Sequence, residues 1–154
     1  VNVVRVTTAD ELYDAALEHA VGADVTIATA AVADWRPAEH RESKVRKDGE
    51  ELTVRLAPNP DVLAALGERK RSTFLVGFAA ETEDHEEHAR DKLRRKHLDA
   101  IAVNDVRGER GFGTGENELV LLWGEAERRE LGRGTKAALA ARLLDAIEEL
   151  MRCS

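Results

Sequence analysis

The stretch that decides the fold class is TFLVGFAAETEDHEEHARDKLRRKHLDAIAV, residues 73–103. It contains two short apolar runs, at 73–80 and 99–103, and between them an acid-rich segment of helical length at about 83–97. Apolar runs of small and β-branched residues without polar alternation are typical of strands that are covered on both faces. A strand, a helix and a second strand in this order predict two parallel strands joined by a crossover helix.

The same alternation continues on both sides of this unit. Upstream, Thr8 and Glu11 have the spacing of a capping box. Asn59-Pro60 predicts another helix start, with Asn59 as the N-cap and Pro60 at the first helical position. Downstream, Thr135 precedes a final amphipathic helix. Further strands are predicted at 2–6, 24–32 and 118–123. The pattern predicts one α/β domain, a Rossmann-like three-layer fold with a mainly parallel sheet.

One segment departs from this alternation. Residues 34–43 are polar and predict a loop, and two alternating segments, 44–47 and 51–56, follow it. Asp48-Gly49 lies between them, and Asp-Gly flanked by alternating residues is a strong hairpin signal. We therefore expect a protruding β-hairpin arm over 44–56.

Composition limits the class of protein. The chain has 154 residues, with 30 acidic and 23 basic side chains and a formal charge of −7. This balance argues against a nucleic-acid partner, and the absence of a run of about eighteen apolar residues argues against a membrane span. A single cysteine, Cys153, provides neither a disulfide framework nor a zinc site, so we expect a cytoplasmic protein. The first residues, VNVVRV, resemble neither a signal peptide nor a transit peptide.

The ends of the predicted strands carry the candidate binding groups, because ligands of open parallel sheets bind beyond the carboxyl ends of the strands. Small or polar residues stand at these ends: Ala30, Ala31, Ala33, Asp34, Glu81 and Asn104-Asp105. The helix start at Asn59-Pro60-Asp61 offers N–H groups and a positive dipole end to a phosphate. These features predict a small phosphorylated ligand. A structural explanation stays open, since alanine packs well under a helix and aspartate often starts a turn.

Other motifs carry weaker signals. Neither G-x-G-x-x-G nor a Walker A sequence occurs, which disfavours a nicotinamide-dependent dehydrogenase. The glycine-rich segment 108–115 precedes a strand and is expected to be a loop. His85 and His88 lie on an acidic helix turn without an identifiable third ligand, so we expect a solvated helix face there rather than a metal site.

Five motifs and one glycine-rich segment occur in an order that resembles a known family. They are AAVADW (30–35), KVRKDGEELTV (44–54), NPDVLAALG (59–67), LVGFAAET (75–82), LDAIAVNDV (98–106) and GFGTGENE (111–118). Together they resemble the phosphopantothenoylcysteine synthetase domain, in bacteria and archaea the C-terminal half of a bifunctional coenzyme A biosynthesis protein. The resemblance implies a ligase that joins 4'-phosphopantothenate to L-cysteine. It would use CTP and Mg²⁺, pass through an acyl-cytidylate, and release CMP and pyrophosphate.

The resemblance also implies roles for individual residues. Lys44 matches the family's catalytic lysine and lies on the predicted arm, which helps to build the family's homodimer. Without the resemblance, Lys44 is expected to be a solvated strand residue. The positions that match nucleotide-binding residues are Ala30, Ala31, Val32, Asp34, Asn59, Pro60, Asp61, Val62, Phe78, Lys92 and Lys96. For Lys92 and Lys96, helix geometry argues against a place near the nucleotide. A helix that starts at the carboxyl end of a strand extends by about 1.5 Å per residue towards the far edge of the sheet, away from the strand ends where the ligand is expected. The metal ligands are not assigned.

Relative to the family, the chain begins late. The family's synthetase domain starts with a strand, a glycine-containing loop, a helix and a further strand, and that part carries a catalytic asparagine. The flavin-dependent decarboxylase half, which would hold FMN, is missing as well. We therefore expect a fragment that binds CTP but does not complete catalysis alone. Two alternatives stay open, a non-catalytic CTP-binding and dimerisation module and an ATP-using synthetase of the eukaryotic kind, although AAVAD and NPDV favour the bacterial pattern.

Overall fold

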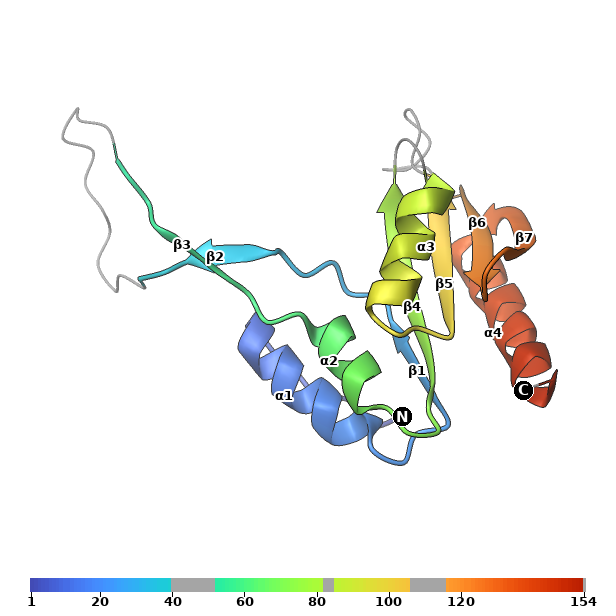
Figure 1. The fold of residues 1–154 in the computed structure, drawn as a ribbon, viewed down its shortest axis with the longest axis horizontal. Coiled ribbons are helices and arrows are strands. Elements are labelled where there is room, and N and C mark those ends of the chain that lie inside the picture. Colours follow the sequence, from blue (N-terminus) through green and yellow to red (C-terminus); the bar gives the residue numbers. More distant parts are fainter. Residues whose placement is uncertain (40–51, 82–84, 106–115, 154) are drawn as a thin grey trace.

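The computed structural model describes residues 1–39, 52–81, 85–105 and 116–153, which form a five-stranded sheet, a two-stranded sheet and flanking helices (Figure 1). The larger sheet has the strand order β1 (Val25–Ala28), β4 (Phe74–Glu81), β5 (Ala100–Asp105), β6 (Glu116–Trp123) and β7 (Glu127–Thr135). The smaller sheet pairs β2 (Trp35–Pro37) with β3 (Leu56–Pro58). The helices are α1 (Ala9–Ala20), α2 (Val62–Arg69), α3 (His85–Arg95) and α4 (Lys136–Cys153).

The larger sheet is mixed, so the expectation of a mainly parallel sheet is wrong for one half of it. β1, β4 and β5 are parallel as predicted, whereas β6 and β7 are antiparallel to their neighbours. The segment 106–115 between β5 and β6 is shorter than the dozen or so residues that a parallel crossover needs. The sequence analysis missed β7 because its residues are mostly charged and exposed, with Leu131 as its buried contact to the core.

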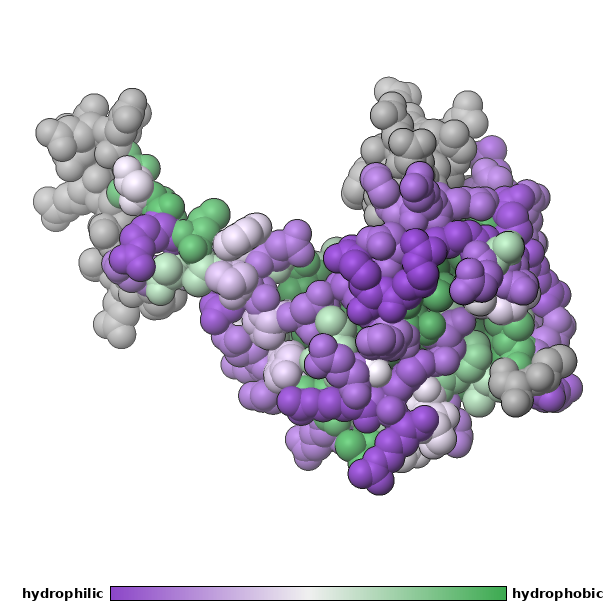
Figure 2. Space-filling view, in the orientation of Figure 1, coloured by the Kyte–Doolittle hydropathy of each residue, from purple (hydrophilic) through white to green (hydrophobic). Residues whose placement is uncertain are grey.

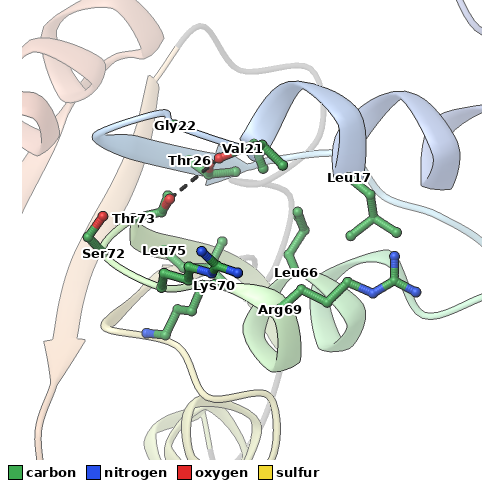
Figure 3. Close-up of a pocket in the computed structure, with 12 residues that line it drawn as sticks. Leu17, Val21, Gly22, Thr26, Leu66, Arg69, Lys70, Ser72, Thr73 and Leu75 are labelled. Carbon is green, nitrogen blue, oxygen red and sulfur yellow. Dashed lines mark hydrogen bonds between the residues drawn. The ribbon is translucent and has the colours of Figure 1, made fainter.

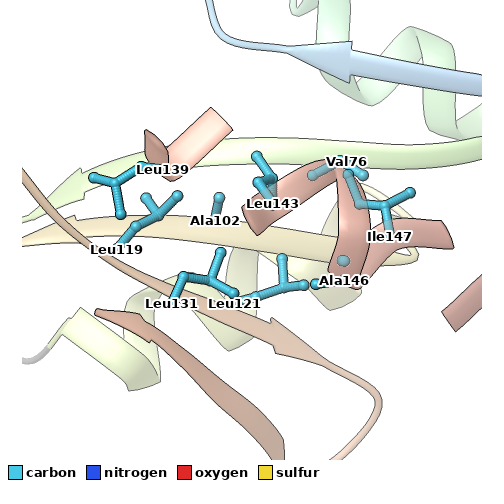
Figure 4. Close-up of a cluster of buried hydrophobic side chains, with 10 residues drawn as sticks. Val76, Ala102, Leu119, Leu121, Leu131, Leu139, Leu143, Ala146 and Ile147 are labelled. Atoms are coloured by element: carbon cyan, nitrogen blue, oxygen red, sulfur yellow. The ribbon is translucent and has the colours of Figure 1, made fainter. Parts of the chain in front are cut away.

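Helices cover both faces of this sheet, which gives the three predicted layers. On one face, Leu139, Leu143 and Ile147 of α4 pack against Leu121 and other strand residues (Figure 4). On the other face, α2 and α3 pack against Leu75 and the remaining inward side chains of β4 and β5. α1 lies outside α2 on this side (Figure 1).

Two predicted helix caps are confirmed. The Thr8 hydroxyl accepts a hydrogen bond from the Glu11 N–H at 3.1 Å, and the Glu11 carboxylate accepts one from the Thr8 N–H at 3.2 Å. At the start of α4, the Thr135 hydroxyl accepts a hydrogen bond from the Ala138 N–H at 3.3 Å. Each cap satisfies a backbone N–H that has no partner inside its helix.

The predicted strand over 2–6 is wrong, because residues 1–7 form no strand. No described strand pairs with them, and the side chains of Val3 and Val4 are 73% and 53% exposed. The strand predicted over 24–32 ends early, at Ala28. The predicted loop over 34–43 contains β2 at its start, since Trp35–Pro37 pair with β3.

β2 and β3 form the base of an arm that extends away from the rest of the molecule (Figure 1). The pair is antiparallel, with Trp35 opposite Pro58 and Pro37 opposite Leu56. An excursion from the main sheet is therefore confirmed, while the predicted turn at Asp48-Gly49 falls within residues 40–51, outside the described part. Among the described residues, no helix combines the length and the apolar character needed to cross a membrane.

Candidate functional site

A cleft of about 680 Å³ lies at the carboxyl end of β1, and we call it the β1 cleft. Its lining comes from α1, the segment after β1, the start of α2, β4 and the end of α3. β1 stops at Ala28, opposite Gly77, whereas β4 continues to Glu81. The cleft therefore lies level with the middle of β4, at the edge of the sheet.

The structure brings most of the predicted nucleotide-binding residues into this cleft. Those that line it are Ala30, Val32, Asp34, Asn59, Pro60, Asp61, Val62, Phe78, Lys92 and Lys96. Ala31 lies on the same segment but does not line the cleft, and Lys44 falls outside the described residues. Sequence reasoning missed Leu12 and Ala16 of α1, whose apolar helical spacing predicted only core packing. The nucleotide-binding role of these residues stays a prediction.

Lys92 of α3 and Lys96, which directly follows α3, both reach the cleft, contrary to the expectation from helix geometry. The Lys92 Nζ lies 3.5 Å from the Phe78 carbonyl oxygen, and the Lys96 Nζ lies 2.7 Å from the Asp61 Oδ2. The argument from helix geometry assumed a site at the carboxyl end of β4, near the start of α3. The cleft lies instead at the carboxyl end of β1, which stops earlier. The last turn of α3 is therefore level with the cleft.

The other polar strand ends are separate from the cleft. β4 and β5 end in register, with Ala80 opposite Asn104 and Glu81 opposite Asp105, beyond the point where β1 stops. Asn104 does not line the cleft, and the side chains of Glu81 and Asp105 lie outside the described part. Of the predicted strand-end residues, Asp34 thus lies in the cleft and Asn104 does not, and a binding role for Asp34 stays a prediction.

Asp61 connects the start of α2 to the end of α3. Its Oδ1 accepts hydrogen bonds from the Ala64 N–H at 3.0 Å and from the Lys96 Nζ at 2.9 Å. It is the N-cap of α2, which begins at Val62, so the predicted cap at Asn59 is wrong. Partial burial alone would raise the pKa of the Asp61 carboxyl. The hydrogen bonds from Lys96 and Ala64 and the charges of Lys96 and Lys92 outweigh burial and hold that pKa below its ordinary 3.8.

The contact between α2 and α3 requires the glycine at position 67. A Cβ atom there would lie 1.9 Å from the Lys96 carbonyl oxygen and 2.9 Å from the Lys96 carbonyl carbon. Backbone atoms cannot move aside as a flexible side chain can, so only glycine allows this approach. The close packing brings Asp61, six residues earlier, within reach of the Lys96 side chain.

Asn59 bridges the two chain segments that form the arm side of the cleft. Its Nδ2 donates a hydrogen bond to the Ala33 carbonyl oxygen at 2.7 Å, and its N–H donates one to the Asp34 carbonyl oxygen at 2.8 Å. Its Oδ1 accepts a hydrogen bond from Arg36 Nη1 at 3.0 Å. Both ends of the Asn59 amide are thus used within the protein. Arg36 lies in the predicted loop over 34–43, and no sequence motif indicates that it would bond to Asn59.

A second cavity, of about 550 Å³, lies towards the amino ends of β1 and β4 (Figure 3). Leu17, Val21, Leu66 and Leu75 give it an apolar lining, and Thr73 Oγ1 closes one side with a hydrogen bond to the Ala23 carbonyl oxygen at 2.9 Å. It contains none of the predicted site residues. In the part of the chain that the structure describes, no group of three or more His, Cys, Asp or Glu residues could hold a metal ion.

Residues 1–151 match the model of a family described as the DNA/pantothenate metabolism flavoprotein C-terminal domain. The chain belongs to this family. The chain is also 43% identical over 150 residues to the coenzyme A biosynthesis bifunctional protein CoaBC of Haemophilus influenzae. The CoaBC of Bacillus subtilis is 37% identical over 150 residues. Each alignment covers 97% of this chain but 37% of the relative, so the chain spans little more than a third of these proteins.

A solved structure supports membership of the DNA/pantothenate metabolism flavoprotein C-terminal family. The crystal structure of the C-terminal domain of CoaBC matches this chain with a TM-score of 0.78 at 33% identity. The match covers 98% of this chain and 66% of that one. The fold described above, with its mixed sheet and small second sheet, is therefore a fold of this family.

Proposed function

We propose that this domain is the phosphopantothenate–cysteine ligase of coenzyme A biosynthesis. It joins 4'-phosphopantothenate to L-cysteine and uses CTP to activate the acid. The observation that carries the proposal is the β1 cleft, which is lined by residues of two separate motifs, AAVAD and NPDV, and by Lys92 and Lys96. Membership of a family that includes CoaBC proteins supports the same activity.

The chemistry explains why the cleft needs cations. A carboxylate is a poor acyl donor, so a carboxylate oxygen of 4'-phosphopantothenate first attacks the α-phosphorus of CTP, and pyrophosphate leaves. The amine of L-cysteine then attacks the acyl carbon of the acyl-cytidylate, and CMP leaves. Negative charge on the phosphoryl oxygens has to be balanced by preorganised donors. Lys92 and Lys96 provide positive charge in the cleft, where Lys96 also pairs with Asp61, and we assign the catalytic role to Lys44 of the arm.

One carboxylate of the cleft, that of Asp34, suits a magnesium ion that arrives with the triphosphate. Mg²⁺ keeps several water ligands and binds one or two carboxylates together with substrate phosphates, rather than a cage of protein ligands. The cleft contains the exposed carboxylate of Asp34, and the described residues form no larger ligand cluster. When bound, the ion would neutralise phosphate charge beside Asp34.

The arm supports a homodimer as the working form. Its described side chains include several exposed apolar ones: Trp35 (58% exposed), Leu52 (61%), Val54 (53%) and Leu56 (56%). Figure 2 shows hydrophobic residues gathered along the arm, in contrast to the hydrophilic surface of the body on this face. Apolar surface gathered on a projecting element is typical of a protein–protein interface.

The nucleotide-binding part of the proposal is tested at Asp34. We expect Asp34→Ala to weaken the binding of CTP with Mg²⁺ by at least about tenfold, because a hydrogen bond to a charged group contributes about 1.5–3 kcal/mol. The measurement is titration calorimetry. Asp24→Ala is the matched control, since Asp24 is an exposed acid just before β1, at the opposite end from the cleft. Unchanged affinity in a folded Asp34→Ala variant would remove Asp34 from the site.

A further inference from the structure

We propose that Arg36 is a positioning residue, which holds the base of the arm to the wall of the β1 cleft and acts on the nucleotide through Asn59. This inference rests on the proposed function, because it concerns the same nucleotide. Arg36 is in the middle of β2 and does not itself line the cleft. Its influence on a ligand therefore has to pass through the groups that it contacts.

The guanidinium of Arg36 contacts the turn that leads from the arm into α2. Its Nη1 donates hydrogen bonds to the Pro58 carbonyl oxygen at 2.8 Å and to Asn59 Oδ1 at 3.0 Å. Asn59 in turn holds the segment after β1 through the carbonyl oxygens of Ala33 and Asp34. Arg36 thus fixes the orientation of the Asn59 amide, and Asn59 joins two segments that line the cleft.

The same side chain also reaches α1. Arg36 Nη2 lies 3.5 Å from Asp10 Oδ2, in the first turn of that helix, and the two side chains are 43% and 61% exposed. An ion pair with this exposure contributes little to stability. The bonds to Pro58 and Asn59 are therefore the important ones, and the contact with Asp10 provides an internal control.

The shortness of the arm's base makes this contact necessary. β2 and β3 have three residues each, and their pairing is extended by the hydrogen bond from the Ala38 N–H to the Arg55 carbonyl oxygen at 2.8 Å. Few backbone bonds thus fix the direction in which the arm leaves the body.

The first test measures CTP binding with Mg²⁺ by calorimetry in the 154-residue chain. Arg36→Met keeps an apolar side chain of similar length but has no hydrogen-bond donor. We expect it to weaken CTP binding about tenfold, because a hydrogen bond from a charged group is lost. Arg36→Lys keeps a charged donor and should recover most of the affinity. Asp10→Ala should bind as the unsubstituted chain does. Because Arg36 acts through Asn59, the double variant with Asn59→Ala should bind no more weakly than Asn59→Ala alone.

The second test does not depend on a nucleotide. Hydrogen exchange of the Asn59 and Ala38 amides should be faster in Arg36→Met, because both amides donate to carbonyl groups at the arm's base. The Lys70 amide, which bonds to the Leu66 carbonyl oxygen at the far end of α2, should exchange at an unchanged rate. Unchanged exchange at Asn59 and Ala38 would overturn the inference.

The outcomes separate the inference from the proposed function. If the unsubstituted chain binds CTP and Arg36→Met binds it equally well, the inference is wrong and the proposed function stands. Additive losses in the double variant would likewise exclude action through Asn59. If the unsubstituted chain does not bind CTP, the proposed function is contradicted, and the exchange rates alone decide whether Arg36 holds the arm's base.

Discussion

At the scale of single residues, the β1 cleft depends on the carboxylate of Asp61, which its neighbours hold in the charged form. Asp61 caps α2 and pairs with Lys96, and its pKa lies below the ordinary 3.8 because the bonds from Lys96 and Ala64 outweigh partial burial. A carboxyl with a lowered folded-state pKa stabilises the fold above its unfolded-state pKa. That contribution is lost as the pH falls through the lower, folded-state value.

The lowered pKa of Asp61 gives a prediction for Asp61→Asn. Asparagine is a good N-cap, so α2 keeps its start, but the charge that titrates is gone. We expect the unsubstituted chain to lose more stability than Asp61→Asn between about pH 6 and about pH 3, because at the lower pH the carboxyl of Asp61 takes up a proton more readily in the unfolded state than in the folded state. The free energy of unfolding by urea at the two pH values measures this. Equal losses in both proteins would show that the pair with Lys96 does not lower this pKa.

Single residues also show where sequence reasoning succeeds and fails. Thr8 and Thr135 were predictable as caps because a cap depends on neighbours within one turn. The predicted cap at Asn59 was wrong, because its amide is used by Ala33 and Arg36, residues more than twenty positions away. Bonds across such separations leave no pattern in the local sequence, and the contribution of Arg36 was missed for the same reason.

At the scale of elements, the site depends on the close approach of α2 to the backbone of Lys96, just after α3. We predict that Gly67→Ala destabilises the fold by about 1–3 kcal/mol or more, the usual cost of overpacking, since the added methyl group meets the Lys96 carbonyl. It should also weaken CTP binding, because α2 has to move away from Lys96. Urea unfolding and calorimetry measure the two effects.

The control for this prediction lies one position further along α2. Glu68 is exposed, so Glu68→Ala should change stability by no more than about 0.5 kcal/mol. A Gly67→Ala variant as stable as Glu68→Ala would show that α2 and α3 have room between them and that the contact does not position Lys96.

Elements also explain why the sheet was only partly predicted. Buried runs such as 73–80 and 99–103 identified β4 and β5, because a strand covered on both faces has a distinctive composition. The directions of β6 and β7 and the early end of β1 depend on which strands pair and in which register. That early end sets the level of the cleft, which is why Lys92 and Lys96 reach it although helix geometry argued against them.

At the scale of the whole molecule, the arm places an apolar surface far from the core (Figure 1). We predict that the chain is a dimer through this surface and that Trp35→Ser combined with Leu56→Ser shifts it to a monomer. The reason is that both side chains are more than half exposed in the single chain. Sedimentation velocity over a range of concentrations measures the change.

A matched control uses Leu144, which is 55% exposed and belongs to α4, the helix on the opposite side of the body from the arm (Figure 1). Leu144→Ser should sediment as the unsubstituted chain does. If the unsubstituted chain is a monomer at all concentrations, or if Leu144→Ser dissociates it instead, the arm is not the interface.

The central claim is that the β1 cleft binds CTP, and calorimetric titration of the unsubstituted chain with CTP and, separately, with ATP, each with Mg²⁺, tests it most directly. The account predicts saturable binding of CTP and much weaker or no binding of ATP, with the CTP signal lost in Asp34→Ala. Binding of ATP alone would support a synthetase of the eukaryotic kind and contradict the proposed nucleotide. Binding of neither would contradict the claim that the cleft formed by these residues is a nucleotide site.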